Sequence, residues 1–195
     1  MKRDLLTSLL AVVVLTVALG LVYPLAITGI SQVAFPGAAD GSQVKLDGKV
    51  VGSKLIGQEF TGKAFFHSRP SATEYSGDVT FFGNAGPNSA ELRDAIRANL
   101  DAYLKLERPY DRQLTRDAVP VDAVTESASG VDPHISEANA RIQAHRVAAV
   151  RGLPLDRVEA LVADHTDGRS LGLFGEPGVN VLQLNVALEE EAPLK

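Results

Sequence analysis

An uncharged apolar stretch from Leu5 to Ile30 is the feature that most constrains how this chain can fold. Its 26 residues include no Asp, Glu, Lys, Arg or His, and fifteen of them are Leu, Ile or Val. About 20 apolar helical residues are enough to cross a hydrocarbon core of roughly 30 Å. A cleavable signal sequence is the alternative, but its apolar region spans only about 7–15 residues. The stretch therefore predicts a transmembrane helix over residues 5–33.

The charges on either side of this helix predict its orientation. Lys2 and Arg3 precede it, and the next basic residue is Lys45. Basic residues are enriched on the cytoplasmic side of membrane helices. We therefore expect residues 1–4 in the cytoplasm and residues 34–195 outside it.

Small, weakly polar residues recur every four positions along the helix, at Thr16, Gly20, Pro24 and Thr28. Stripes of small residues let helix backbones approach closely in lipid. Pro24 also has no N–H, so the carbonyl of Gly20 loses its usual partner. The stripe favours a helix that packs against other helices in the membrane. A lone anchor that tolerates Gly and Pro is the alternative.

The residues after the helix are sufficient for one domain with its own core. The chain has no Cys, and its net charge of −5 argues against a nucleic-acid partner. The patterns predict a hairpin over 44–50, a loop over 73–87, helices starting at Asn88, over 136–152 and over 155–165, and strands over 119–124 and 171–174. Residues 179–188 fit a helix or a strand, because both periodicities are present. The expected fold class is α+β: one N-terminal transmembrane helix followed by a single mixed α/β extracytoplasmic domain.

Few residues of the domain form a pattern that indicates chemistry. Ser71, Asp132 and His134 could supply a hydrolase triad, but the serine lacks the Gly-x-Ser-x-Gly context. The four histidines show no metal-ligand spacing, so we predict no metal site. Arg69 could hold a carboxylate of a partner or pair within the domain. An anchored hydrolase and an anchored module that binds a small solute both remain alternatives to a subunit of a larger assembly.

A loop of small residues is the second candidate site. Ser127, Ser129 and Gly130 could present backbone N–H groups to an anion, as glycine-rich turns do. An ordinary surface loop is the alternative, since no helix follows directly to add its dipole.

Several blocks of sequence together resemble one family. They are Gly20-x-x-Tyr23-Pro24, Phe66-x-x-Arg69-Pro70-Ser71-Ala72, residues 129–136, Gln143-x-x-Arg146, and residues 175–185. In this combination the chain is similar to the KdpC family, the single-span subunits of the bacterial Kdp potassium-transporting P-type ATPase. The similarity covers nearly the whole chain.

The resemblance implies a non-catalytic role in potassium uptake at the bacterial inner membrane. It implies KdpA, KdpB and KdpF as partner subunits, contact with membrane lipid, potassium as the transported ion, and a chaperone effect on the ATP-hydrolysing KdpB. The P-type motif Asp-Lys-Thr-Gly-Thr is absent from this chain, which assigns hydrolysis to a partner. Candidate partner contacts are Arg69, Ser71, Asp132 and His134. The resemblance also implies a nucleotide contact at Ser127, Ser129, Gly130 and Gln143, although the predicted topology places these residues away from cytoplasmic ATP.

Overall fold

The computed structural model describes residues 2–78 and 83–194. The chain divides into two compact units, the first ending at Gln43 and the second starting at Val44. The first contains an N-terminal apolar helix, and the second is a domain of mixed helix and sheet. This confirms the predicted fold class.

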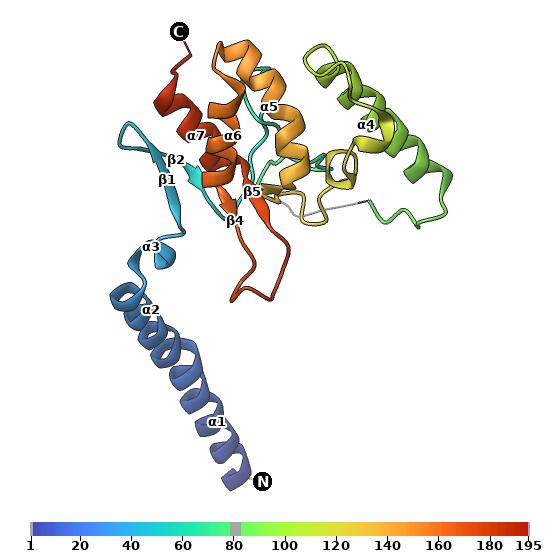
Figure 1. Ribbon diagram of the computed structural model, residues 1–195. Helices are drawn as coiled ribbons and strands as arrows, with labels where there is room; N and C mark the ends of the chain where they lie inside the picture. The colour runs from blue at the N-terminus through green and yellow to red at the C-terminus, as the bar shows by residue number, and fades with distance from the viewer. Residues whose placement is uncertain (1, 79–82, 195) are drawn as a thin grey trace. The chain divides into compact units, whose positions relative to one another are not determined.

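The first unit is built on one helix with an irregular turn in its middle (Figure 1). It consists of α1 (Lys2–Val17), a π-helical turn η1 (Ala18–Val22) and α2 (Tyr23–Ala34), and a short turn α3 (Pro36–Ala39) follows. The segment Lys2–Ala34 is long and apolar enough to cross a membrane. Its described side chains are unburied within the chain. Such a helix needs lipid or other helices around it.

The second unit begins with the predicted hairpin. Strands β1 (Gln43–Leu46) and β2 (Lys49–Ser53) flank Asp47 and Gly48, which adopt φ angles of 50° and 76°. Positive φ at both central residues defines the type I′ turn that the Asp-Gly pair favours.

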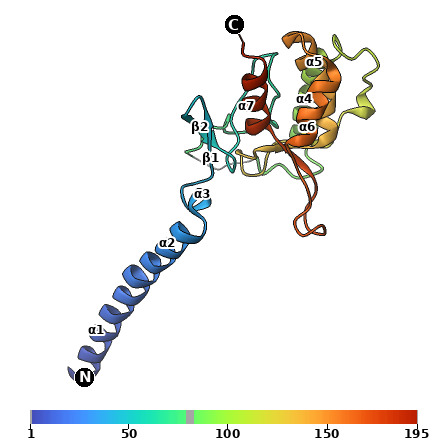
Figure 2. The ribbon, with the colours of Figure 1, turned by 60° about the vertical axis from the view of Figure 1, so that its left-hand side comes forward.

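Three helices pack beside a small antiparallel sheet to form the core (Figures 1 and 2). The helices α5 (Glu137–Arg151), α6 (Leu155–Asp164) and α7 (Val181–Glu191) are in contact in that order, and α5 also contacts α4 (Ala90–Glu107). The strands β3 (His134–Ile135), β5 (Gly178–Asn180) and β4 (Thr166–Asp167) lie side by side in that order. The fully buried core side chains include Phe66, Val147, Val158, Val179 and Leu184.

Local capping signals predicted the bounds of α5 well. Ser136 is the N-cap of α5 and its Oγ accepts the N–H of Asn139 at 3.1 Å, while Gly152 ends the helix at φ 69°. The segment 179–188, which fits both a helix and a strand by its periodicity, contains parts of both: the end of a strand and the start of a helix. Strand β5 ends at Asn180, whose Oδ1 accepts the N–H of Gln183 at 3.1 Å and so starts α7.

Three expectations about elements were wrong. Helix α4 is capped by Ser89 and not Asn88, because the Oγ of Ser89 accepts the N–H of Leu92. Residues 119–124 are no strand; they contain the short 3₁₀ helix η3 (Val121–Ala123), which follows η2 (Arg116–Ala118). Residues 171–174 form a turn closed by one bridge between Ser170 and Phe174.

Of the predicted loop 73–87, residues 79–82 lie outside the described part, and the rest has neither helix nor strand.

Candidate functional site

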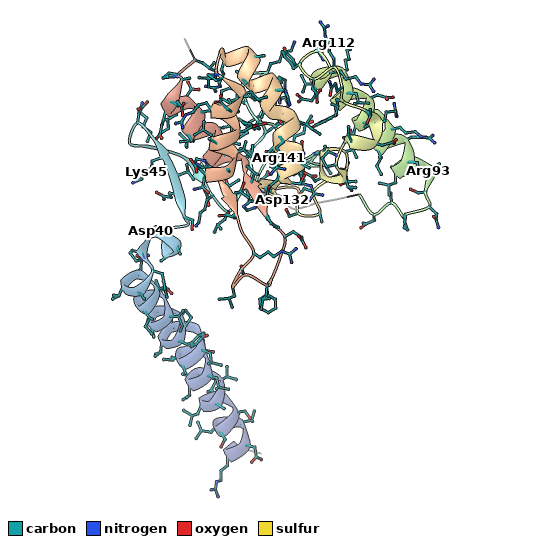
Figure 3. All side chains as sticks on the ribbon, viewed as in Figure 1. Asp40, Lys45, Arg93, Arg112, Asp132 and Arg141 are labelled. Carbon is teal, nitrogen blue, oxygen red and sulfur yellow. The ribbon has the colours of Figure 1, made fainter. Side chains whose placement is uncertain are left out.

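A cavity of about 480 Å³ lies in the domain between α4, α5 and the irregular segment 59–75. Of the residues predicted from the sequence, Arg69, Ser71 and Gln143 line it. Residues within 127–132 bond to Arg69, Pro70 and Ser71 in the wall of this cavity. The structure therefore brings most of the predicted site residues into one region of the domain, at the base of α5, where Figure 3 labels Asp132.

Two side-chain amides hold the segment that forms the cavity wall. Asn185 accepts the N–H of Phe66 at 2.8 Å and donates to its carbonyl at 2.9 Å. Gln143 does the same for His67, at 2.7 and 3.1 Å. The two amides replace the neighbouring strand that an extended segment would otherwise need for its backbone groups.

Gln143 uses its full hydrogen-bonding capacity inside the chain. Besides its bonds to His67, its Nε2 donates to Asn139 at 2.9 Å and its Oε1 accepts from Arg146 at 3.0 Å. A carboxamide has two N–H donors and two acceptor lone pairs. Any ligand that bonded to this side chain would have to displace one of these partners.

Arg69 pairs with Asp132 within the domain, which is one of the two alternatives that the sequence offered for this arginine. The guanidinium Nη1 lies 3.0 Å from the Asp132 carboxylate, and Nη2 donates to the carbonyl of Glu126 at 3.2 Å. The second carboxylate oxygen accepts the N–H of His134 at 3.0 Å. Asp132 therefore shapes the loop before α5 and links it to the cavity wall at Arg69.

The small-residue loop is bonded to the same wall. The N–H of Ser127 donates to the Pro70 carbonyl at 2.8 Å, and the N–H of Gly130 donates to the Ser127 carbonyl at 3.1 Å. The hydroxyl of Ser71 donates to the Gly130 carbonyl at 2.7 Å. The Ser129 hydroxyl accepts the N–H of Val131 at 3.2 Å. The N–H groups of Ser127 and Gly130 thus bond within the domain, so they do not point to an unfilled anion site.

Tyr75 fixes the loop and the wall to each other. Its hydroxyl donates to the carbonyls of Arg69, at 3.0 Å, and Asp132, at 3.3 Å. Burial is the main cause that raises the pKa of Tyr75 to about 12. A Cβ at Gly57 would lie 2.5 Å from both the Asp132 carbonyl oxygen and the Tyr75 ring, so this approach requires glycine.

The predicted triad is not formed, because the Ser71 hydroxyl bonds to Thr73 and Gly130 and not to His134. The Nε2 of His134 lies 3.2 Å from the Asp167 carboxylate, and its Nδ1 lies 4.0 Å from the Asp132 carboxylate. The described residues also include no group of three or more His, Cys, Asp or Glu side chains that could hold a metal ion.

A buried ion pair that no sequence pattern predicted lies next to the cavity. The Nε of Arg146 donates to Glu107 at 2.9 Å, and both side chains are at most 1% exposed. Arg146 also donates to the carbonyls of Lys63 and Phe65, at 2.5 and 2.8 Å. Burial raises the pKa of Glu107, and the charge of Arg146 opposes that shift. The helical spacing of residues 139, 143 and 146 was the available signal, but polar residues at such spacing ordinarily face solvent.

Two ionisable groups beside this pair are kept neutral. Burial, followed by the charge of Arg146, lowers the pKa of His67 to about 4. Burial and the nearby Glu107 carboxylate raise the pKa of Tyr103, whose hydroxyl donates to Asn139 at 2.8 Å. Arg146 and Glu107 thus form a buried ion pair beside the neutral side chains of His67 and Tyr103.

The stripe of small residues from Thr16 to Thr28 includes the π-helical turn η1. In η1 the N–H of Tyr23 donates to the carbonyl of Ala18, five residues back, directly before Pro24. A π-turn absorbs one extra residue, which rotates the following helix back by about 100°. In a regular α-helix Thr28 would lie about 120° around the axis from Thr16, and the π-turn reduces this to about 20°. The turn therefore brings Thr16, Pro24 and Thr28 closer to one line.

These features together define a class of protein: an α/β domain whose polar site residues bond to one another, joined to the one helix of the described residues that is long and apolar enough to cross a membrane. The family model described as "KdpC: K+-transporting ATPase, c chain" matches residues 5–190. The chain therefore belongs to the KdpC family and is an accessory subunit of a P-type potassium-transporting ATPase.

Proteins named "Potassium-transporting ATPase KdpC subunit" match along nearly their full length. The relative from Koribacter versatilis is 45% identical, over 100% of this chain and 98% of its own. The one from Rhodospirillum rubrum is 47% identical, over 100% and 99%. The one from Nitratidesulfovibrio vulgaris is 49% identical, over 93% and 91%.

Proposed function

We propose that the chain supports assembly of the Kdp complex and acts as a catalytic chaperone that raises the ATP affinity of KdpB. Its partners are KdpA, KdpB and KdpF. Its N-terminus is cytoplasmic, its domain lies outside the inner membrane, and the stripe from Thr16 to Thr28 packs against helices of the partners.

The observation that carries this proposal is the use of the domain's polar site residues inside the domain. Arg69, Ser71 and Gln143 all bond to backbone or side-chain groups of the same chain. A reactive site needs a nucleophile next to a base, or donors aimed at a vacant position. In the described part of the chain, the Ser71 hydroxyl bonds to Thr73 and Gly130 and not to a base, which favours a role through contact and the subunit interpretation over an anchored hydrolase.

The chaperone effect then acts through the partners. With the domain outside the membrane, cytoplasmic ATP does not reach Gln143, whose donors and acceptors are already used. A direct nucleotide contact at Ser127, Ser129, Gly130 and Gln143 remains a secondary prediction.

Purified complexes with and without this chain test the chaperone role. We expect the complex that lacks the chain to show a higher KM for ATP, measured by potassium-stimulated hydrolysis. An unchanged KM, in a complex that retains the other subunits, would contradict the chaperone role while leaving the assembly role to its own test.

A pair of glycine variants tests the packing role of the helix. A Cβ at Gly20 would lie 3.9 Å from the Thr16 side chain on the stripe, whereas Gly29 has nothing within 4 Å. We expect Gly20→Ile to block close helix approach and reduce co-purification with the other subunits. Gly29→Ile is the matched control and should co-purify as the natural chain does. Equal recovery of both variants would argue against the stripe as a packing face.

A further inference from the structure

The turn that joins β4 to β5 exposes three large apolar side chains. Leu171 is 90% exposed, Leu173 75% and Phe174 65%, and we refer to these three residues as the apolar tip. Figure 3 shows side chains of this turn projecting away from the domain. Because the apolar tip sits on a projecting turn and not in a groove, it can enter a recess on another molecule.

The turn holds these side chains outward by defined contacts. Ser170 and Phe174 exchange backbone hydrogen bonds of 2.8 and 3.0 Å, and Arg169 pairs with Glu176 at 2.8 Å below the turn. Leu171 adopts a φ of 54°, a left-handed conformation that is unfavourable for a leucine. The side chain of Leu171 is almost fully exposed, so burial does not offset this unfavourable conformation. A residue that is both strained and exposed does not stabilise its own fold, which indicates a contact outside the chain.

We propose that the apolar tip inserts into an apolar recess on an integral membrane subunit of the same ATPase. This inference rests on the assembly role and the orientation proposed above. It adds to them a specific contact surface on the domain.

The attachment to the membrane helix supports a partner at the membrane surface. Eight residues, 35–42, lie between α2 and β1. At roughly 3.3–3.6 Å each they span less than about 30 Å even when fully extended. Within the domain, the start of β1 and the β4–β5 turn lie at the same end, and the C-terminus lies at the other (Figures 1 and 2). The apolar tip is therefore at the tethered end, within reach of a membrane subunit.

The charge around the apolar tip favours protein over lipid as its partner. The nearby ionisable residues are Asp167, Arg169 and Glu176, and the one basic group among them is paired with Glu176. Peripheral segments that insert into anionic bilayers combine apolar side chains with unpaired Lys or Arg. The fully buried core of a protein interface is instead apolar, enriched in aromatic residues such as Phe and poor in charged residues, with a polar rim around it.

The first test replaces Leu171 by a polar residue that tolerates the left-handed conformation. We expect Leu171→Asn to reduce the affinity of the full-length chain for the tagged remaining subunits by about tenfold or more, from the loss of one buried leucine. The melting temperature of the chain should stay the same or rise, since Asn adopts positive φ more easily. Val121→Asn, at a residue 73% exposed in η3, is the matched control and should assemble normally.

The results separate this contact from the proposed function. Equal assembly of the Leu171→Asn and Val121→Asn chains would overturn the contact, while normal recovery of the natural chain would leave the assembly role standing. Failure of the natural chain to co-purify would overturn both.

The second test uses the absence of cysteine from the chain. We expect a maleimide-polymer reagent to label Leu173→Cys readily when the full-length chain is alone in vesicles of phosphatidylethanolamine and phosphatidylglycerol. In the assembled complex, labelling should be at least about tenfold slower. Val121→Cys should react equally in both. Protection in vesicles that lack the other subunits would identify lipid as the partner, and equal labelling in the complex would exclude a buried contact; either result overturns the proposal.

Discussion

The inner face of α5 and the β4–β5 turn reverse the usual distribution of polar and apolar residues. Helix α5 buries Asn139, Gln143 and Arg146, whereas the turn exposes Leu171 and Phe174. Gln143 and Arg146 bond to a segment that has no strand beside it, and Asn139 bonds to Tyr103 and Asp122. The exposed apolar side chains keep most of their surface outside the described fold. The comparison shows that polar groups are used for folding here, while apolar surface is left for contacts outside the domain.

Removing Arg146 is the largest change that this comparison predicts. Arg146→Met would leave Glu107 buried without its counter-charge and would remove three further hydrogen bonds, to the carbonyls of Lys63 and Phe65 and to the Gln143 side chain. We expect a loss of about 3–5 kcal/mol of unfolding free energy, the usual effect of breaking a buried pair. Urea unfolding of the full-length chain in detergent, followed by circular dichroism, measures it.

The double variant sharpens this prediction. Arg146→Met with Glu107→Met removes both charges and should recover part of the lost stability, since well-packed apolar residues can replace a buried ion pair. A single variant as stable as the natural chain would show that the polar groups under α5 do not stabilise the fold.

The histidine beside this pair predicts a pH dependence. The pKa of His67 is lowered to about 4 in the folded chain, against an ordinary value of 6.5. Between these values the unfolded chain binds a proton that the folded chain does not. Stability should therefore be complete above about pH 6.5 and fall toward pH 4, by up to about 3 kcal/mol. His67→Gln should flatten the slope between pH 5 and 6.5, and an unchanged slope would contradict the buried neutral histidine.

Gln143 tests whether amide pairing stabilises the cavity wall. Gln143→Leu keeps the volume but leaves the N–H and carbonyl of His67 without partners. We expect a loss of about 1–3 kcal/mol, the cost of unsatisfied buried polar groups. Gln183→Leu is the control, because this glutamine of α7 lies at a half-buried position. Similar losses in the two variants would remove the distinction between the inner face of α5 and an ordinary helix surface.

The smallest effect is expected in the turn and has the opposite sign. Leu171→Gly relieves the left-handed conformation at a side chain that buries nothing. We expect a gain of up to about 1 kcal/mol, measured by the same unfolding experiment. A clear loss would show that Leu171 contributes to folding, and the contrast between the two regions would weaken.

The sequence predicted the elements whose boundaries are set by neighbouring residues. Ser136 and Gly152 bound α5, and Asp47-Gly48 makes the first hairpin, because a cap or tight turn depends on a few consecutive residues. Where two adjacent residues can both cap, as Asn88 and Ser89 can, the local rule does not choose between them. The prediction of a strand over residues 119–124 was wrong for a related reason. Pro120 directly precedes the 3₁₀ turn η3 and so opens a turn in an otherwise strand-like run.

The site was harder to predict because its partners are far apart in the sequence. Gln143 bonds to a residue 76 positions away, and Arg146 bonds to carbonyls more than 80 positions away. The apolar residues of α5 do not mark its inner face either, because Ala138 is exposed and Ile142 is half-buried. The polar residues are inside because the segment 63–68 needs hydrogen-bond partners there, which no local pattern shows.

The potassium-stimulated ATPase activity of a complex that carries Ser71→Ala tests the central claim most directly, namely that the domain acts through contacts and not through chemistry of its own. The account predicts full assembly and a turnover per complex close to that of the natural chain, because the Ser71 hydroxyl serves to hold Gly130. A fall of about 100-fold or more in a fully assembled complex, the size expected for loss of a reacting group, would contradict it.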